Sequence, residues 1–463
     1  YVYKNIPPPT NDFLKRVYLG KIPIMLRSNL CVLNNMEPDT MYQMGESKYE
    51  TGGYFIIDGA EKVIVSIERR AENKIFFLKS GIDDKLTHVA ELKSSSLEVF
   101  EPARTVKLQV EKSGAITVRF GQDTPFFTQN EGRDIPLFAV FRMLGIETDK
   151  EILEYICHDL NNDLSQKMIS LLYPSINDNL IKAHDIYDQD TAMLYLENRV
   201  RRSQETGGYL DMIKHVDSRM SYLLTTIYEN CFPHVGRDMT AKSHYLGYMT
   251  QQLLYFILNI EPETSRDNFI NKRVDLSGFL LSNSFRNSLR ELIRKIGLNL
   301  KSKYEQSHTE YSDVDFANLI NERNFLEILD YHKFQEHFGD AMKKGNIDLS
   351  LGSKRGAVQA LERKSYISDL SHLRRIIDPI PAGARVSLDR RRLHGSQYGC
   401  VCPVETPEGG NVGLKKALAM MSDVSFGCSP KSLITLIKKS GLVELGDIHP
   451  RNIYGLTKVF VNG

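Results

Sequence analysis

Two pairs of aspartates have a spacing that would suit a magnesium site. Asp188 with Asp190, and Asp313 with Asp315, each place two carboxylates two residues apart, and such a pair could hold Mg²⁺ for phosphoryl transfer. Each pair lies in a polar stretch with no further ligand nearby in the sequence. Because a Mg²⁺ site also needs a shaped surrounding, we interpret both pairs as solvated loop acids.

Other catalytic patterns are absent from the sequence. It contains no phosphate-binding loop G-x-x-x-x-G-K-[ST], no G-x-S-x-G nucleophile elbow and no H-E-x-x-H metal helix. Cys400 and Cys402 stand two residues apart without a second cysteine pair, and His394 is the nearest imidazole. Because structural zinc needs four ligands, we expect free, buried or half-buried thiols here. The chain therefore shows no self-contained active site.

Positive charge is concentrated between Lys354 and Lys416. This segment has twelve lysines and arginines and six acids, a net charge of +6, whereas the whole chain carries +1, so the other residues carry −5. Within it, Arg374-Arg375 and Arg390-Arg391-Arg392 flank a loop stiffened by two prolines. A stiff loop holds guanidinium groups near phosphates at low entropic cost, which predicts an anionic partner. The alternative is an exposed basic loop that binds nothing in particular.

Glu408 lies within this basic segment, in the sequence Thr406-Pro-Glu-Gly409. Proline at the second position and glycine at the fourth are typical of a type I turn. The turn would present the carboxylate beside several arginines. Glu408 then either neutralises an arginine or orients a polar substrate in a nucleic-acid channel, and its charge alone leaves both interpretations open.

Distinctive blocks of sequence are spread over nearly the whole chain. In the basic segment they are His372-Leu-Arg-Arg375, Arg392-Leu-His394, Gly399, Cys402-Pro403, Glu405-Thr-Pro-Glu-Gly409 and Gly413-Leu414. Before it they are residues 20–28, 52–63, 134–136, 141–146, 246–249, 266–269 and 272–278. Taken in their order along the chain, the blocks resemble those of the second-largest, β-like subunit of multisubunit DNA-dependent RNA polymerases. The early blocks are closer to the eukaryotic, archaeal and large-DNA-virus branch, whereas Asn411 looks more bacterial. Gln397 stands where relatives commonly have histidine, so we give it no role.

The resemblance implies an α+β, multidomain fold with mixed sheets and packed helices, as part of a polymerase cleft. It places the first part of the protrusion at 1–70, the lobe at 71–270 and the second part of the protrusion at 271–345. It places the fork at 346–428 and the start of a truncated external domain at 429–463.

The resemblance also implies which residues face the active centre. The positions near the substrate or the RNA–DNA hybrid are Gln359, His372, Arg374, Arg375, Glu408 and Asn411. The loop at the DNA fork contains Asp378, Gly383, Arg385, Arg390, Arg391 and Arg392. Neither set contains a catalytic residue or a metal ligand, because the family's largest subunit holds the catalytic Mg²⁺. This chain is therefore expected to contribute to RNA synthesis without performing it alone.

The implied partners are the largest polymerase subunit, smaller assembly subunits, the DNA template, the RNA–DNA hybrid and nucleoside triphosphates. Two alternatives stay open. One is a stand-alone nucleic-acid-binding module without polymerase activity, and the other is an autonomous nucleotidyltransferase that uses one of the aspartate pairs.

Composition excludes several classes of protein. The chain has 463 residues, of which 41% are hydrophobic and 25% are charged, as in ordinary globular proteins. No apolar run approaches the ~18 residues of a spanning helix, and the first residues lack a signal-peptide pattern. The six cysteines are few and scattered, which favours a reducing, intracellular compartment. A net charge of +1 excludes a uniformly basic surface.

The elements that must position these residues change along the chain. Residues 18–120 read as strand-rich, with two strands around an Asp-Gly turn in 54–67. Helical periodicity follows at 135–144, 150–160, 191–201, 211–230, 246–257 and 284–305. Residues 457–463 read as a hairpin strand without its returning partner. Since Tyr1 is also not a methionine, we expect a fragment of a longer protein.

Overall fold

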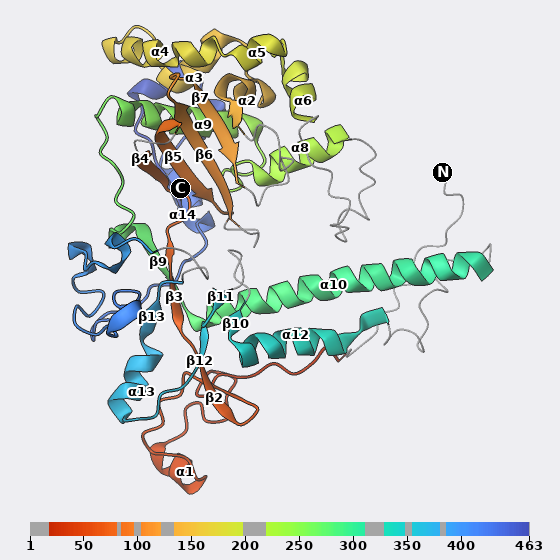
Figure 1. Ribbon diagram of the computed structural model, residues 1–463, viewed down its shortest axis with the longest axis vertical. Coiled ribbons are helices and arrows are strands. Elements are labelled where there is room, and N and C mark those ends of the chain that lie inside the picture. Colours follow the sequence, from red (N-terminus) through yellow and green to blue (C-terminus); the bar gives the residue numbers. More distant parts are fainter. Residues whose placement is uncertain are drawn as a thin grey trace. The chain divides into compact units, whose positions relative to one another are not determined.

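The computed structural model describes residues 18–80, 85–96, 103–121, 134–197, 219–310, 328–347, 354–379 and 386–462. They form two compact units (Figure 1). Unit 1 comes from the described parts of 1–68, 274–392 and 399–422, and unit 2 from those of 69–273, 393–398 and 423–463. The fold combines packed helices with mixed and antiparallel sheets, so the predicted α+β, multidomain class is confirmed.

Two sheets of unit 1 bring the N-terminal strands beside the basic segment. Strands β1 (Phe55–Ile57), β2 (Ala60–Ile64) and β12 (Val358–Ala360) form an antiparallel sheet in the order β1-β2-β12. A second sheet has the order β14-β13-β3-β9, made of β3 (Ser66–Arg70), β9 (Lys272–Asp275), β13 (Arg375–Ile377) and β14 (Lys415–Ala417). Strand β13 runs parallel to β3 and antiparallel to β14. Residues some 300 positions apart in sequence thus become neighbours.

The predicted Asp-Gly turn joins β1 to β2. Asp58 and Gly59 have φ of +50° and +77°, the left-handed conformation that a two-residue hairpin turn requires. The strand prediction for 18–50 is wrong, because this stretch contains turns and the helix α1 (Pro38–Gln43). Pro23 lacks a donor for a strand ladder and lies between the exposed Ile22 and Ile24.

Helices complete unit 1. They are α10 (Ser277–Glu310), α12 (Tyr331–Lys344) and α13 (Tyr366–Leu373), with a small antiparallel pair of β10 (Asn346–Ile347) and β11 (Lys354–Arg355). Helices α10 and α12 lie side by side (Figure 1), where the ring of Phe285 meets Phe334 edge-to-face at 5.6 Å. Leu280 and Met342 extend this contact into a core with strand residues such as Ile67. The sheets that carry the basic segment therefore pack against the hydrophobic core of unit 1.

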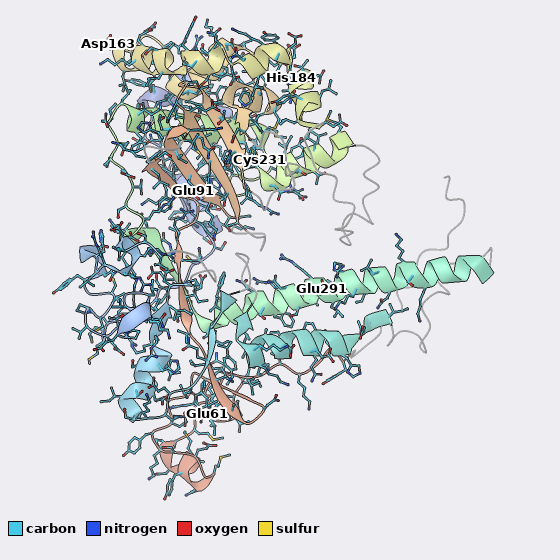
Figure 2. All side chains as sticks on the ribbon, viewed as in Figure 1. Glu61, Glu91, Asp163, His184, Cys231 and Glu291 are labelled. Carbon is cyan, nitrogen blue, oxygen red and sulfur yellow. The ribbon has the colours of Figure 1, made fainter. Side chains whose placement is uncertain are left out.

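Unit 2 is built on a five-stranded antiparallel meander. Its strands, in both chain and sheet order, are β4 (Ile75–Lys79), β5 (Leu86–Ser94), β6 (Arg104–Glu111), β7 (Ile116–Phe120) and β8 (Asp134–Pro136). Alternate residues of β5, β6 and β7 are buried and apolar, as a sheet with one face on a core requires. On the other face, Glu91 binds Arg70, Arg266 and Lys107 (Figure 2).

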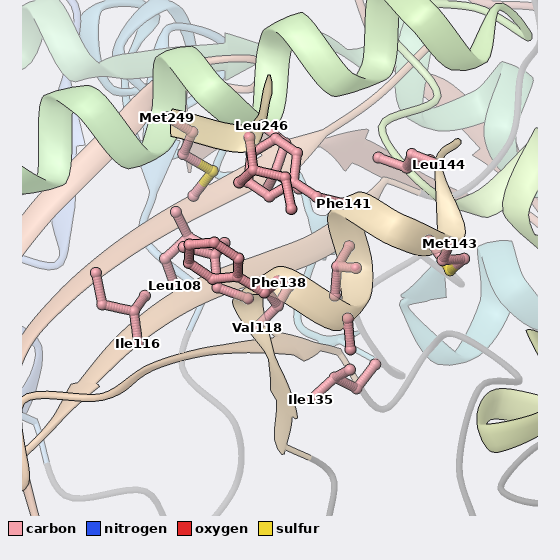
Figure 3. Close-up of a cluster of buried hydrophobic side chains, with 14 of the residues drawn as sticks. Leu108, Ile116, Val118, Ile135, Phe138, Phe141, Met143, Leu144, Leu246 and Met249 are labelled. Carbon is pink, nitrogen blue, oxygen red and sulfur yellow. The ribbon is translucent and has the colours of Figure 1, made fainter. Parts of the chain in front are cut away.

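Helices cover the apolar face of this sheet. They are α2 (Leu137–Met143), α3 (Asp149–Cys157), α4 (Asp163–Ile176), α5 (Asn179–Ala183), α6 (Gln189–Glu197), α8 (Arg219–Asn230) and α9 (Met239–Ile257). The unit also contains α14 (Lys431–Lys439), which has no buried residue. Every residue of α2 is buried, and Figure 3 shows Phe138 and Phe141 among side chains from the sheet and from α9. In the described residues, no helix is both long and apolar enough to cross a membrane.

Gly247 allows α9 to approach α3 closely. A Cβ at this position would lie 2.3 Å from the carbonyl oxygen of Tyr155, which is inside van der Waals contact. Farther along α9 toward its N-terminus, the buried ammonium of Lys242 donates to the carbonyls of Ile227 and Tyr228, each at 2.7 Å. It thereby caps the end of α8, beside the buried Cys231 (Figure 2).

The strand predicted at the C-terminal end does not form. Residues 457–460 pair with no strand among the described residues and instead lie along α9. Lys458 donates to Gln251 at 3.2 Å, and the ring of Phe460 lies 5.1 Å from that of Tyr248. Side-chain packing on the helix thus replaces the backbone pairing that the alternating pattern suggested.

Candidate nucleic-acid interface

The loop at the predicted DNA fork is closed at its base by an ion pair. Arg390, in the 3₁₀ helix η3 (Asp389–Arg391), donates from Nε and Nη2 to the two carboxylate oxygens of Asp378 at 3.0 and 2.5 Å. The Asp378 side chain is only 6% exposed, whereas that of Arg390 is 38% exposed, so the carboxylate is shielded from water and the guanidinium is not. The ion pair joins the end of β13 to η3. Gly383 and Arg385, which we assigned to this loop, lie outside the described residues.

Gln359 and His372 form one hydrogen-bonded unit. The Nδ1 atom of His372 accepts from the Glu362 N–H at 3.1 Å, so the ring proton resides on Nε2, which donates to Gln359 Oε1 at 3.2 Å. Burial, and then the charge of Arg375, lowers the pKa of His372. The imidazole is therefore neutral at pH 7 and fixes the carboxamide of Gln359 without offering a positive charge.

Arg374 and Arg375 have internal partners. Arg374 follows α13, and its Nη2 donates to the carbonyls of Ala419 at 2.8 Å and Ser422 at 3.0 Å. Arg375 begins β13 and lies 3.7 Å from a carboxylate oxygen of Glu362. Arg374 thereby holds the loop after β14. The place of both arginines near the RNA–DNA hybrid stays a prediction.

The segment 405–413 is held by a hydroxyl and a guanidinium group. Thr406 Oγ1 accepts from the Gly413 N–H and donates to the Lys415 carbonyl, both at 2.9 Å. Arg391 Nη1 donates to the carbonyls of Gly410 at 2.6 Å and Val412 at 3.1 Å. Both contacts act on backbone atoms, so the path of this segment is fixed from two sides.

Glu408 and Asn411 project from this held segment. Both are exposed, and among the described residues neither side chain has a hydrogen-bond or ion-pair partner. The interpretation in which Glu408 neutralises an arginine is therefore not supported by the described contacts. The predicted type I turn is wrong, since Glu408 is extended with φ −72° and ψ 159°, and the chain reverses in η5 (Gly409–Asn411).

The sequence did not reveal Arg363 as an organising residue. Its guanidinium donates to Glu61 (Figure 2) at 2.9 and 3.1 Å and to Asp369 at 3.0 Å. It also lies over the ring of Tyr54, 4.9 Å from the centroid. Glu61 is 302 residues away in the chain, so no local pattern could have shown the contact. Arg363 ties the segment before α13 to the N-terminal sheet.

Much of the basic segment's charge is thus neutralised internally. Lys416 forms an ion pair with Glu68 at 2.8 Å, and the Glu68 side chain is 1% exposed. Arg392 differs, because its side chain is 75% exposed and, among the described residues, forms an ion pair with the exposed Asp389 alone, at 3.2 Å. The net charge of +6 in the sequence therefore overstates the charge that this surface offers to a polyanion.

The remaining predicted ligands lie elsewhere. Asp188 and Asp190 are exposed at the start of α6, while Asp313 and Asp315 lie outside the described residues. Among described residues, no group of three His, Cys, Asp or Glu side chains is placed to hold a metal ion. Cys400 and Cys402 are free, half-buried thiols, as predicted.

Two family profiles match the sequence. The profile described as RNA polymerase beta subunit matches residues 9–325, more than half of the chain. The chain belongs to this RNA polymerase beta subunit family. A second profile, described as RNA polymerase Rpb2, domain 3, matches residues 359–424, which contain the held segment with Glu408 and Asn411. The resemblance drawn from the motifs is therefore confirmed at the level of the family.

Relatives in this family align with almost the whole chain. DNA-directed RNA polymerase II subunit 2 of Arabidopsis thaliana is 32% identical over 461 residues, 98% of this chain and 36% of the relative. Subunit RPB2 of Schizosaccharomyces pombe is 34% identical over 454 residues, 97% of this chain and 35% of the relative. Subunit Rpo2N of Methanothermobacter thermautotrophicus is 28% identical over 442 residues, 93% of this chain and 79% of the relative. These relatives agree with the predicted eukaryotic and archaeal branch of the family. The chain spans about a third of the eukaryotic relatives' length.

Proposed function

We propose that the chain is the protrusion, lobe and fork portion of the second-largest subunit of a DNA-directed RNA polymerase. It forms one jaw of the DNA cleft and the fork at the active centre, with the domain boundaries predicted above. The polymerase names of the relatives support this function and give no support to a stand-alone binding module. The intracellular location follows from the same proposal.

The observation that carries the proposal is the held segment 405–413. A carboxylate and a carboxamide, from Glu408 and Asn411, project from a backbone that Thr406 and Arg391 fix. Fixed polar groups without internal partners are suited to orienting a polar ligand, because little entropy is lost when the ligand binds. We assign Glu408 to the incoming nucleotide, and Asn411, Gln359, His372 and Arg375 to the hybrid or RNA path.

The assembled enzyme would supply what this chain lacks. The proposed partners are the largest subunit, smaller assembly subunits, template DNA, the RNA–DNA hybrid and nucleoside triphosphates. Mg²⁺, held by the largest subunit, would stabilise the charge that develops during phosphoryl transfer. The chain's own residues would position the nucleic acid and the nucleotide around that centre.

Replacing Glu408 by alanine tests this assignment in the assembled polymerase. We expect elongation to slow about tenfold, as the loss of one productive hydrogen bond worth ~1.4 kcal/mol predicts. Assembly should be unchanged, because the exposed Glu408 side chain has no hydrogen-bond or ion-pair partner among the described residues. Glu336→Ala, on the exposed face of α12, is the matched control. Normal elongation by the Glu408 variant would contradict the assignment.

Arg392 and Arg391 are expected to affect binding to nucleic acid differently. Arg392→Gln should reduce the slope of log affinity against log salt by about one, because an exposed cation that contacts phosphate releases one counterion. Arg391→Gln should leave the slope unchanged and slow nucleotide addition, since its guanidinium binds the Gly410 and Val412 carbonyls. Filter binding of an RNA–DNA hybrid to the assembled enzyme at several salt concentrations measures the salt slopes of both variants. A single-turnover nucleotide-addition assay measures the rate. Equal slopes for the two variants would rule out this division of roles.

A further inference from the structure

Strand β4 is an edge of the five-stranded sheet in unit 2, and part of its outer side is open. The Phe77 N–H donates to Thr264 Oγ1 at 3.2 Å, and the Phe77 carbonyl accepts from the Thr264 N–H at 3.0 Å. Because these directions alternate along an antiparallel strand, the N–H and carbonyl of Ile75 also point outward. Within the described part of the chain, no hydrogen bond to these two Ile75 groups is found on that side. An open edge of this kind can pair with another chain.

A cavity of about 480 Å³ adjoins this open edge. One wall is a single face of α9, where Tyr245, Tyr248 and Gln252 follow one another at helical spacing. The loop 261–271 and the ring of Phe460 form the other sides. The cavity thus combines aromatic rings, side-chain amides and a free backbone donor and acceptor.

The charges around the cavity favour a basic ligand. Glu261 and Glu263 line it, and neither forms an ion pair within the described chain, although Glu263 Oε1 accepts from the Lys79 N–H at 3.3 Å. Lys74 is the lining residue of opposite sign. The Tyr248 ring already interacts with one cation, because the ammonium of Lys458, which does not line the cavity, lies 5.2 Å from its centre. A ligand cation would therefore meet Tyr248 from the cavity side and rely on Glu261 for its charge partner. Carboxylates at the rim would repel the phosphates of a nucleic acid.

We propose that this cavity binds a short extended segment of a partner protein, which pairs with the backbone of Ile75 and places a lysine or arginine against Tyr248 and Glu261. The backbone pairing would supply most of the affinity, and the basic side chain would supply the specificity. The proposal rests on unit 2 alone and does not depend on the role of the chain in transcription.

Fluorescence anisotropy with designed peptides and the full chain tests the proposal. The probe is a labelled seven-residue peptide of alternating valine and threonine with one central arginine. We expect saturable binding, and about tenfold weaker binding when citrulline replaces arginine, because citrulline keeps the shape and loses the charge. Two N-methylated peptides, one methylated on its odd and the other on its even residues, should differ in affinity, since only one set of N–H groups faces the strand edge. Equal affinity for arginine and citrulline peptides, or for the two methylated peptides, would overturn the proposal.

Variants of the chain locate the binding site. Glu261→Gln should weaken the arginine peptide about tenfold and leave the citrulline peptide unchanged. Glu147→Gln, an exposed glutamate outside the cavity, is the matched control. Ile75→Pro removes the outward N–H, so binding should be lost. Thermal unfolding of this variant is measured alongside, because the Ile75 side chain packs against the core of unit 2. Unchanged binding by both Glu261→Gln and Ile75→Pro, or displacement of the peptide by a single-stranded oligonucleotide at equal concentration, would refute the assignment of the site.

Discussion

Replacing Gly413 by alanine is expected to slow nucleotide addition by an assembled polymerase at least about tenfold. Gly413 has φ of +73°, and a Cβ there would lie 2.2 Å from the carbonyl oxygen of Arg391. The left-handed conformation costs an L residue about 1–2 kcal/mol, and a clash with backbone cannot be relieved by rotating a side chain. The segment must therefore shift, moving Glu408 and Asn411. Displacing a positioning group by about 1 Å can reduce a rate by about a hundredfold.

Gly410→Ala is the matched control for this prediction. Its added Cβ would meet nothing within 4 Å, and its φ is not in the left-handed region. We expect this variant to elongate at a nearly normal rate in a single-turnover nucleotide-addition assay. Assembly and thermal unfolding of both variants should be measured alongside. If Gly413→Ala elongated as fast as Gly410→Ala, the close approach of Arg391 and Gly413 would have no role in placing Glu408.

Acidification to pH 5.5 is expected to destabilise unit 2 by about 4 kcal/mol relative to pH 8. Burial lowers the pKa of His158, His234 and His244 from 6.5 to about 4 in each case. Lys458 adds to the effect at His158, and Lys242 adds to it at His234. Below pH 6.5 the unfolded chain binds protons that the folded chain excludes, so stability is complete above this pH. It is lost progressively as the pH falls toward 4, at ~1.4 kcal/mol for each histidine by pH 5.5.

Chemical denaturation of the full chain at several pH values measures this loss. His244 packs its ring 4.6 Å from that of Tyr155, and neither of its ring nitrogens has a hydrogen-bond partner in the described structure. His244→Gln should therefore reduce the pH dependence by about a third, whatever its effect on stability at pH 8. His184→Gln, at an exposed position of the same unit, is the matched substitution for comparison. An equal free energy of unfolding at pH 8 and pH 5.5 would be incompatible with three buried neutral imidazoles.

The basic segment shows what a count of charged residues can and cannot predict. The count correctly marked the region that the Rpb2 domain 3 profile covers. It could not assign each cation, because the partners are distant in the chain. Glu68 is 348 residues from Lys416, and Arg374 reaches carbonyls 45 and 48 residues away. The cation count thus indicated the region, and the contacts decided which cations are exposed.

The sequence by itself determined the family, the α+β class and several local elements. Motif order, hydrophobic periodicity and the Asp58-Gly59 turn are short-range features, so they can be read without knowing the fold. Only the tertiary structure decided the path of 405–413, the neutral state of His372 and the packing of 457–460 on α9. These depend on burial and on hydrogen bonds between residues far apart in the chain. Such contacts override local turn and strand preferences, because a buried or fixed polar group must be satisfied wherever its partner lies in the sequence.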